Sequence, residues 1–209
     1  MKKFILLMLF SCYKLALFSQ SLKNRHIEIN AFASITGTKF NIQLLPKQDS
    51  LEIVFKIRDS TATLLLKDTA YNSCRNKLLS YTYFDLKNDT IKAQLCQLMD
   101  IAEKFTYYRK DSVRIANSDN TNFVMLIDQI FNTSTDSLEN TEQNKNKITL
   151  DGISVSFTFT DGNVVRKVYS STPQLNSYPL LYKLLTTSSN IYRQKKENNF
   201  LDSRSLFGY

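Results

Sequence analysis

The 209-residue chain is poor in the residue types that build most catalytic, metal and phosphate sites. It contains four glycines, three prolines, three cysteines, one histidine and no tryptophan. Its glycines are too far apart for a phosphate-binding loop or a dinucleotide fingerprint. His26, the single histidine, would have to serve any serine–histidine or cysteine–histidine mechanism. The usual zinc sites are also excluded, because the chain has too few cysteines and histidines to supply their ligands. No metal or cofactor is predicted.

The overall composition is that of a soluble globular protein. Apolar residues make up 43% of the chain and charged residues 22%, and the mass is 24.2 kDa. These values exclude a disordered, collagenous or polytopic membrane protein. The length suits one ordinary domain.

The first twenty residues have the pattern of an export signal. Lys2 and Lys3 precede an unbroken apolar run at residues 4–10, and Lys14 interrupts the apolar segment soon afterwards. The run is too short for a membrane-spanning helix, which needs about 20 apolar residues. We therefore predict an export signal at residues 1–21 and a mature chain outside the cytoplasm, in the periplasm, the outer envelope or the medium.

Two processing routes fit this N-terminus. Small residues at positions 19–21 suit a signal peptidase that cuts before Leu22. Alternatively, the segment Leu9–Cys12 resembles a bacterial lipobox, in which Cys12 would be lipidated and become the new N-terminus. Phe10 is bulky for that motif, so simple secretion is favoured. The membrane is a predicted partner only if Cys12 carries a lipid.

Charge does not indicate a nucleic-acid partner. Removing residues 1–21 takes away three of the 27 basic residues and none of the 19 acidic ones, so the net charge falls from +8 to about +5. The remaining charges are scattered, and Lys195–Lys196 is the only adjacent lysine pair. A nucleic-acid interface would need a basic stripe interleaved with aromatic residues.

The two remaining cysteines suggest a disulfide in an oxidising compartment. Apolar spacing predicts helices at Asp68–Leu79 and Asp89–Tyr108, joined by a turn at residues 85–88. In an antiparallel helix pair, Cys74 and Cys96 would be equidistant from the turn and could meet. The alternative is two unrelated buried thiols.

Alternating apolar and polar residues predict strands in the first third of the chain. Three segments joined by turn residues indicate an antiparallel meander: residues 26–32, 40–44 and 51–57. Residues 61–66 are a possible fourth strand, and residues 122–131 are predicted to form a short helix.

A second β-hairpin is predicted after a polar segment, residues 132–146, which has the composition of an exposed loop. Asp161–Gly162 is a strong hairpin signal between apolar segments at 153–160 and 164–170. A helix with Ser177 as N-cap should follow and continue to about Tyr192. The prediction is thus an α+β fold in which an antiparallel β-meander and a second hairpin pack with about three to four helices. We expect one domain at residues 22–196 and a tail at 197–209.

Arg166 is the most unusual residue of the predicted hairpin. With a two-residue turn at Asp161–Gly162 it would lie opposite Phe157, on the apolar side. It could lie over Phe157 with its head in water, or anchor an anionic partner. Together with Pro173 and Tyr178 of the following loop, it forms the predicted binding surface.

These observations favour a secreted or envelope protein that acts by non-catalytic binding or as a structural accessory, with an envelope protein or polymer as partner. A carboxylate-dependent hydrolase of envelope glycans is an alternative, for which Asp100 with Glu103, or Asp151 with Asp161, are the candidate acid pairs. A lipid-anchored inhibitor or immunity-type protein, modified at Cys12, is another. No residue is predicted to be catalytic.

Overall fold

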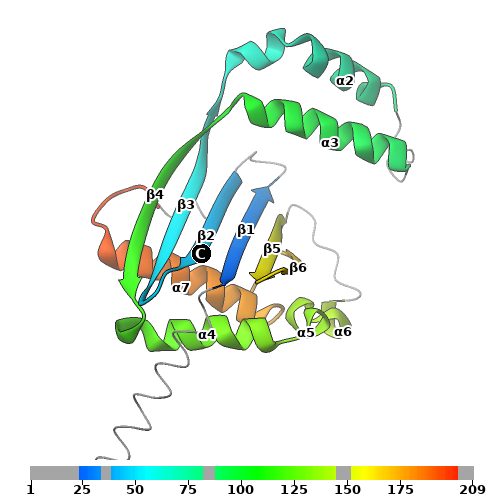
Figure 1. The fold of residues 1–209 in the computed structure, drawn as a ribbon. Coiled ribbons are helices and arrows are strands. Elements are labelled where there is room, and N and C mark those ends of the chain that lie inside the picture. Colours follow the sequence, from blue (N-terminus) through cyan, green and yellow to red (C-terminus); the bar gives the residue numbers. More distant parts are fainter. Residues whose placement is uncertain (1–23, 34–38, 82–87, 145–151, 202–209) are drawn as a thin grey trace, which may run out of the picture. The chain divides into compact units, whose positions relative to one another are not determined.

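The computed structural model describes residues 24–33, 39–81, 88–144 and 152–201, which form an α+β fold with one antiparallel sheet (Figure 1). The predicted fold class is therefore confirmed. The described strands are β1 (Arg25–Ala33), β2 (Lys39–Pro46), β3 (Ser50–Thr61), β4 (Thr106–Ala116), β5 (Ile153–Asp161) and β6 (Val164–Ser171). The described helices are α2 (Thr69–Leu79), α3 (Asp89–Lys104), α4 (Thr121–Asn132), α5 (Thr135–Glu139), α6 (Thr141–Asn144) and α7 (Pro179–Lys195), with short 3₁₀ helices at Thr63–Lys67 and Ser118–Asn120.

The strand order in the sheet is β4-β3-β2-β1-β5-β6. Consecutive antiparallel pairing of β1, β2 and β3 confirms the predicted meander, and the β5–β6 hairpin joins it through β1. Because side chains alternate along a strand, one face of the sheet gathers the apolar residues. This face is buried: Ile29 lies between Ile42 and Phe157, all without exposed surface.

Helices α4 and α7 cover the apolar face. Figure 1 shows α7 crossing behind the strands. The Tyr192 ring of α7 meets Phe55 edge to face at 5.0 Å between centroids, and Phe131 of α4 meets Phe159 at 5.8 Å. Buried side chains of both helices and the sheet form one hydrophobic core. The opposite face of the sheet carries mainly polar side chains.

Strand β4 was not predicted. The helix expected to reach Tyr108 ends at Lys104, and the strand begins at Thr106. Only Val113 and Ile115 of β4 are buried, so its alternation is weak in the sequence. The possible strand at 61–66 is also wrong, because Thr63–Lys67 is a 3₁₀ helix with a single buried residue.

The polar segment at 132–146 is not the exposed loop that its composition predicts. It forms α5 and α6 within the described residues, and Leu138 is buried in the core. The Ser134 hydroxyl caps α5 by accepting from the Ser137 N–H. Local capping, one buried leucine and hydrogen bonds from Asn140 and Asn144 to the Ser177 carbonyl hold this segment. With Ser177 as N-cap, α7 would begin at residue 178. It begins at Pro179, one residue later.

The chain divides into two compact units. The first unit comprises the described residues up to Ile57 and from Lys110 onward, and the second comprises Arg58–Arg109. In the second unit, α2 is capped by Asp68, which accepts from the Tyr71 N–H at 2.7 Å. Helix α3 is capped by Asn88. No helix in the described ranges is both long and apolar enough to cross a bilayer. The predicted export signal, with Cys12, lies outside the described residues.

Candidate functional site

The two edges of the sheet expose different side chains. The sheet ends at β4 on one side and at β6 on the other. Lys110 and Arg114 are exposed on β4, and charged side chains discourage pairing with a further strand. Val164 and Val165 of β6 are 69% and 60% exposed. An edge strand with exposed β-branched residues is a place where another extended chain can join a sheet.

The hairpin turn decides which backbone groups of β6 face outward. Asp161 pairs with Val164, so Gly162 and Asn163 are the turn residues. Gly162 has φ +57°, as the first central residue of a type II′ turn requires. In such a hairpin the residue pair next to the turn, here Asp161 and Val164, exchanges two hydrogen bonds. Further along the strands, hydrogen-bonded pairs alternate with pairs that are not hydrogen-bonded. The N–H and C=O groups of the odd-numbered residues in 165–171 therefore point away from β5.

Only part of this outward edge is open. The Tyr169 N–H donates to Glu139 Oε1 of α5 at 2.9 Å, so α5 satisfies the edge there. In the part of the chain that the structure describes, no further strand accepts from the outward N–H groups of Val165 and Lys167. We call the segment Val165–Lys167 the open edge. Its signal in the sequence is the pair of consecutive valines, which breaks the alternation expected of a half-buried strand.

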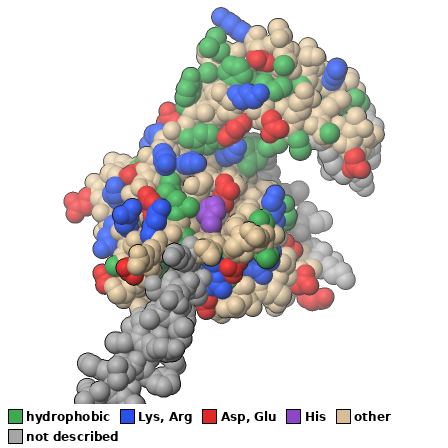
Figure 2. Space-filling model, in the orientation of Figure 1, with side chains coloured by type: hydrophobic (Ala, Val, Ile, Leu, Met, Phe, Trp, Pro, Cys, Tyr) green, Lys and Arg blue, Asp and Glu red, His purple; other side chains and the backbone are tan. Residues whose placement is uncertain are grey.

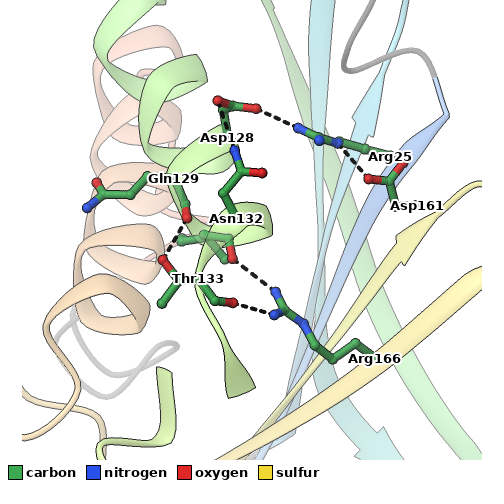
Figure 3. Close-up of polar contacts among 8 residues, drawn as sticks. Arg25, Asp128, Gln129, Asn132, Thr133, Asp161 and Arg166 are labelled. Atoms are coloured by element: carbon green, nitrogen blue, oxygen red, sulfur yellow. Dashed lines mark hydrogen bonds and ion pairs between the residues drawn. The ribbon is translucent and has the colours of Figure 1, made fainter. Parts of the chain in front are cut away.

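Arg166 lies on the apolar side of β6, as predicted, but its cross-strand partner is Phe159 and not Phe157. The predicted partner was wrong by two residues because the turn is formed by Gly162–Asn163 and not by Asp161–Gly162. The guanidinium lies 5.2 Å from the centre of the Phe159 ring. It donates to the Ile130 carbonyl at 2.9 Å and to the Thr133 carbonyl, at the C-terminus of α4 (Figure 3).

This position gives Arg166 a structural role. A cation at a helix C-terminus interacts favourably with the carbonyl groups left without partners there. Burial lowers the pKa of Arg166 from its ordinary value. Two of its nitrogens donate to carbonyl groups at the end of α4. The charge therefore stabilises this helix terminus and is not directed at an anionic partner.

Arg25 also binds α4, at Asp128. No role was predicted for Arg25 from the sequence. Its Nη1 lies 2.6 Å from Asp128 Oδ1 of α4, and its Nε lies 3.0 Å from Asp161 Oδ2 at the end of β5 (Figure 3). The guanidinium also lies 4.7 Å from the centre of the Phe131 ring. Asp161 is therefore a partner of Arg25, and its role in the predicted acid pair has no support.

The loop after β6 does not present the residues predicted for the binding surface. Pro173 and Tyr178 are both buried. The Tyr178 hydroxyl accepts from the outward N–H of Ser171 at 3.4 Å and covers the end of the edge. Leu175 is the large apolar residue that this loop exposes. The loop therefore covers the C-terminal end of β6, four residues beyond the open edge, and exposes Leu175 and not the predicted residues.

A buried polar network joins α7 to β4. The Tyr192 hydroxyl donates to Asp111, which also lies 3.2 Å from Lys196 Nζ and accepts from Asn198 at 3.3 Å. Burial alone would raise the pKa of Asp111, but these hydrogen bonds lower it to about 2. Burial and the bond to Asp111 raise the pKa of Tyr192 to about 12. Both groups hold one protonation state near neutral pH, which suits a structural latch and not proton transfer.

The described residues give no support to either predicted acid pair. Asp100 and Glu103 are exposed on α3, and Asp151 lies outside the described residues. A general acid needs a raised pKa, whereas the pKa of Asp111 is lowered. Among the residues that the structure describes, no three His, Cys, Asp or Glu side chains are grouped to hold a metal ion.

The predicted disulfide is absent, because Cys74 and Cys96 are both unpaired. Cys74 is buried, and its Sγ lies 3.2 Å from the Gln94 carbonyl of α3. Cys96 is exposed; it follows Gln94 by two residues, which is about 200° around a helix. The helices pair as predicted, but this rotation turns Cys96 away from α2.

A groove of about 550 Å³ lies on the outer side of α4 and α7. Met125 is exposed at its surface, and Asp128 in its wall is held by Arg25. The residues that line it are Asn122, Met125, Leu126, Asp128, Gln129, Lys183 and Thr187. Its mixed lining has no buried charge without a partner, so it is a weaker candidate than the open edge.

The chain matches no protein-family model, no curated protein and no solved structure.

Proposed function

We propose that the mature protein lies outside the cytoplasm and acts by binding, without catalysis, and that its open edge takes up an extended segment of a partner protein. The location is supported by the N-terminal sequence, in which Lys2 and Lys3 precede a short apolar run. A binding role is supported by the exposed valines of β6 and by its outward backbone groups, which no further strand pairs among the described residues. The open edge carries the proposal.

The geometry of Val165 and Lys167 is suited to strand addition. Each has its N–H and C=O directed away from β5, so an added strand could form two hydrogen-bonded positions. Backbone hydrogen bonds would supply affinity, and the exposed Val164 and Val165 side chains would supply apolar contact. Beyond Lys167, Tyr169 is already bonded to Glu139, so the added strand is short.

A second copy of this chain is a poor occupant of the edge. A twofold antiparallel pairing that uses only Val165 and Lys167 places Val165 of one copy opposite Lys167 of the other. An apolar side chain opposite a charged one is a poor cross-strand pair. The surface available on three residues is also far below the roughly 800 Å² per partner of a stable dimer. A segment of a different protein fits better.

The chemistry of the edge defines the partner segment. Opposite Val165 it should carry an apolar residue, and opposite Lys167 an aspartate or glutamate. The expected partner is therefore an extended, acidic and partly apolar segment of an envelope protein.

Photocrosslinking can test this proposal. A photoreactive phenylalanine analogue in place of Tyr169 lies next to the open edge, on a side chain that is exposed. After irradiation of cells that export the protein, we expect one discrete adduct. Mass spectrometry should map the attachment to an extended segment with an acidic residue.

Two further variants separate strand addition from other contacts. Val165→Pro removes an outward donor while leaving the β5–β6 ladder intact, and should lower the adduct yield at least tenfold. Val165→Thr keeps the N–H and the branched side chain and should retain the adduct. Equal yields from both variants, or an adduct mapped to a helix, would contradict strand addition.

The intact mass of the protein from its own envelope fraction tests the location. A mass that begins at Leu22 is expected. A chain that begins at Cys12 with acyl groups would make the protein lipid-anchored, with the open edge in the same compartment. An uncleaved chain that begins at Met1 would overturn the export proposal.

A further inference from the structure

The sheet face that is not covered by α4 and α7 carries two adjacent rows of polar side chains. Each row crosses β2, β1 and β5 in the middle of the sheet. In the first row Glu28 lies between Gln43 and Thr158, and in the second Asn30 lies between Asn41 and Ser156. We call these six residues the polar face: Glu28, Asn30, Asn41, Gln43, Ser156 and Thr158.

Asn41 is the most unusual member of the polar face. It is only 8% exposed, although it points away from the hydrophobic core. Its Nδ2 donates to Glu28 Oε1 and to Asn30 Oδ1, both at 2.8 Å. Its Oδ1 is buried and has no hydrogen-bond partner among the described residues. Buried polar atoms are normally paired, so an acceptor without a partner at such a position points to a missing donor.

His26 adds a second atom of this kind. It precedes Glu28 by two residues on β1, so both side chains lie on the same face. Its Nε2 is buried without a partner in the described part of the chain and can accept when the proton is on Nδ1. Figure 2 looks onto this side of the molecule and shows the single histidine, in purple, at the surface.

This face carries charges of both signs. The carboxylate of Glu28 lies in the middle, whereas Lys56 follows Asn41 in one row and Lys167 follows Thr158 in the other. A lysine on each side makes the face a poor site for a cation. The acceptors at Asn41, His26 and Glu28 require a ligand with several donors, and the Ser156 and Thr158 hydroxyls can donate or accept.

Two aromatic side chains lie next to the polar face, one at the end of the row of Asn30 and one in the following row. Tyr169 is the cross-strand neighbour of Ser156 and is 59% exposed. Phe32 follows Asn30 by two residues on β1 and is 37% exposed. Exposed rings beside amides, hydroxyls and a carboxylate combine an apolar platform with dense hydrogen bonding. A pyranose sugar has the complementary surfaces, since its C–H face is apolar and its rim carries hydroxyls.

From this arrangement we infer that the polar face binds an oligosaccharide. Asn41 Oδ1 and His26 Nε2 accept from sugar hydroxyls, the Glu28 carboxylate accepts from a third, and Tyr169 supports a ring. Lys56 at one end of the face, or Lys167 at the other, accommodates a carboxyl group on a sugar. This site uses side chains on the sheet face, so it is independent of the strand addition proposed for the backbone of β6.

Titration with defined oligosaccharides can test the site. The probes are a hexamer of N-acetylglucosamine and a peptide-free strand of alternating N-acetylglucosamine and N-acetylmuramic acid. In nitrogen-edited NMR spectra of the full mature chain, either probe should shift the side-chain amide signals of Asn30, Asn41 and Gln43 in a saturable way. No saturable shift from either probe at millimolar concentration would overturn the inference.

Matched variants identify the surface. Tyr169→Ala should weaken binding at least fivefold, whereas Met125→Ala removes an apolar side chain of similar exposure, 58%, on α4, which covers the opposite face of the sheet, and should leave binding unchanged. Thr158→Val keeps the side-chain shape and should weaken binding about threefold. Equal effects of Tyr169→Ala and Met125→Ala would contradict the site. Val165→Pro should leave sugar binding intact, so the two proposals can fail separately.

Discussion

The two units of the chain are stabilised in different ways. In the first unit, a sheet and two helices share one continuous hydrophobic core. In the second, described residues with buried apolar side chains are few: Leu65, Cys74 and Ile91. That unit instead exposes Leu64, Leu66, Leu79 and Met99. Its helices depend on local signals, namely caps at Asp68 and Asn88, more than on burial.

The comparison teaches that secondary structure and stability have separate origins here. Capping and helix spacing are local, so they define α2 and α3 without a large core. Global stability requires burial, which only the first unit provides in quantity. We therefore expect the second unit to open locally at a lower free energy than the first.

The largest effect should come from the core of the first unit. Phe55 is fully buried, and its ring lies 5.0 Å from that of Tyr192. Phe55→Ala should lower the free energy of unfolding by about 3–5 kcal/mol, because it removes buried area and leaves a cavity. Denaturant unfolding followed by circular dichroism measures this change. Phe32→Ala, at an exposed position, is the control and should cost far less.

A smaller loss is expected at the latch between α7 and β4. Tyr192→Phe leaves Asp111 without its buried donor and should cost about 1–3 kcal/mol at neutral pH. Tyr169→Phe removes an exposed hydroxyl and should have little effect. If Tyr192→Phe had the same free energy of unfolding as the wild type, the Tyr192 hydroxyl would not stabilise the fold.

The same variant should change the dependence of stability on pH. The folded pKa of Asp111, about 2, lies below its ordinary value of 3.8, so its contribution is present above pH 4 and is lost as pH falls towards 2. The folded pKa of Tyr192, about 12, lies above 10, so its contribution is present below pH 10 and is lost between 10 and 12. Tyr192→Phe should flatten both ranges.

Ile91 tests the second unit directly. Ile91→Val should reduce local stability by about 0.5–1.5 kcal/mol. Hydrogen exchange should show faster exchange of amides in α2 and α3, with amides of β1 and β5 unchanged. Leu79→Ala, at an exposed position of the same unit, is the control. Faster exchange in β1 after Ile91→Val would mean that the two units unfold together.

The smallest effect is expected at the cysteines. Cys96→Ser should change the free energy of unfolding by no more than about 0.5 kcal/mol, because Cys96 is exposed and unpaired. In the native protein, Cys96 should react with an alkylating reagent without reductant, and Cys74 only after unfolding. If both thiols react only after reduction, the disulfide predicted from the sequence exists after all.

Much of the fold could be predicted because its signals are local. Alternation of apolar and polar residues predicted β1, β2, β3 and β5 with the correct buried residues, and apolar spacing predicted α2 and α3. Strand β4 was missed because its buried residues are few and Tyr107 and Tyr108 continue a helical spacing. Segment 132–146 was missed because one buried leucine among polar residues carries little signal.

The site was less predictable than the fold. Arg166 was correctly placed on the apolar side, since a shift of two residues preserves the face of a strand. Its partners at the end of α4 come from residues more than thirty positions away. Arg25 bridges Asp128 and Asp161, which are also remote in sequence. Such ion pairs leave no pattern in the sequence.

The sequence by itself determined the α+β class and the faces of the main strands. Each of these depends on residue type and spacing within a few positions. Only the tertiary structure decided that β6 is an edge, that β1 lies in the middle, and that Asn41 meets Glu28 and Asn30. Strand order arises from pairing between distant segments, and the balance of burial over the whole sheet determines it.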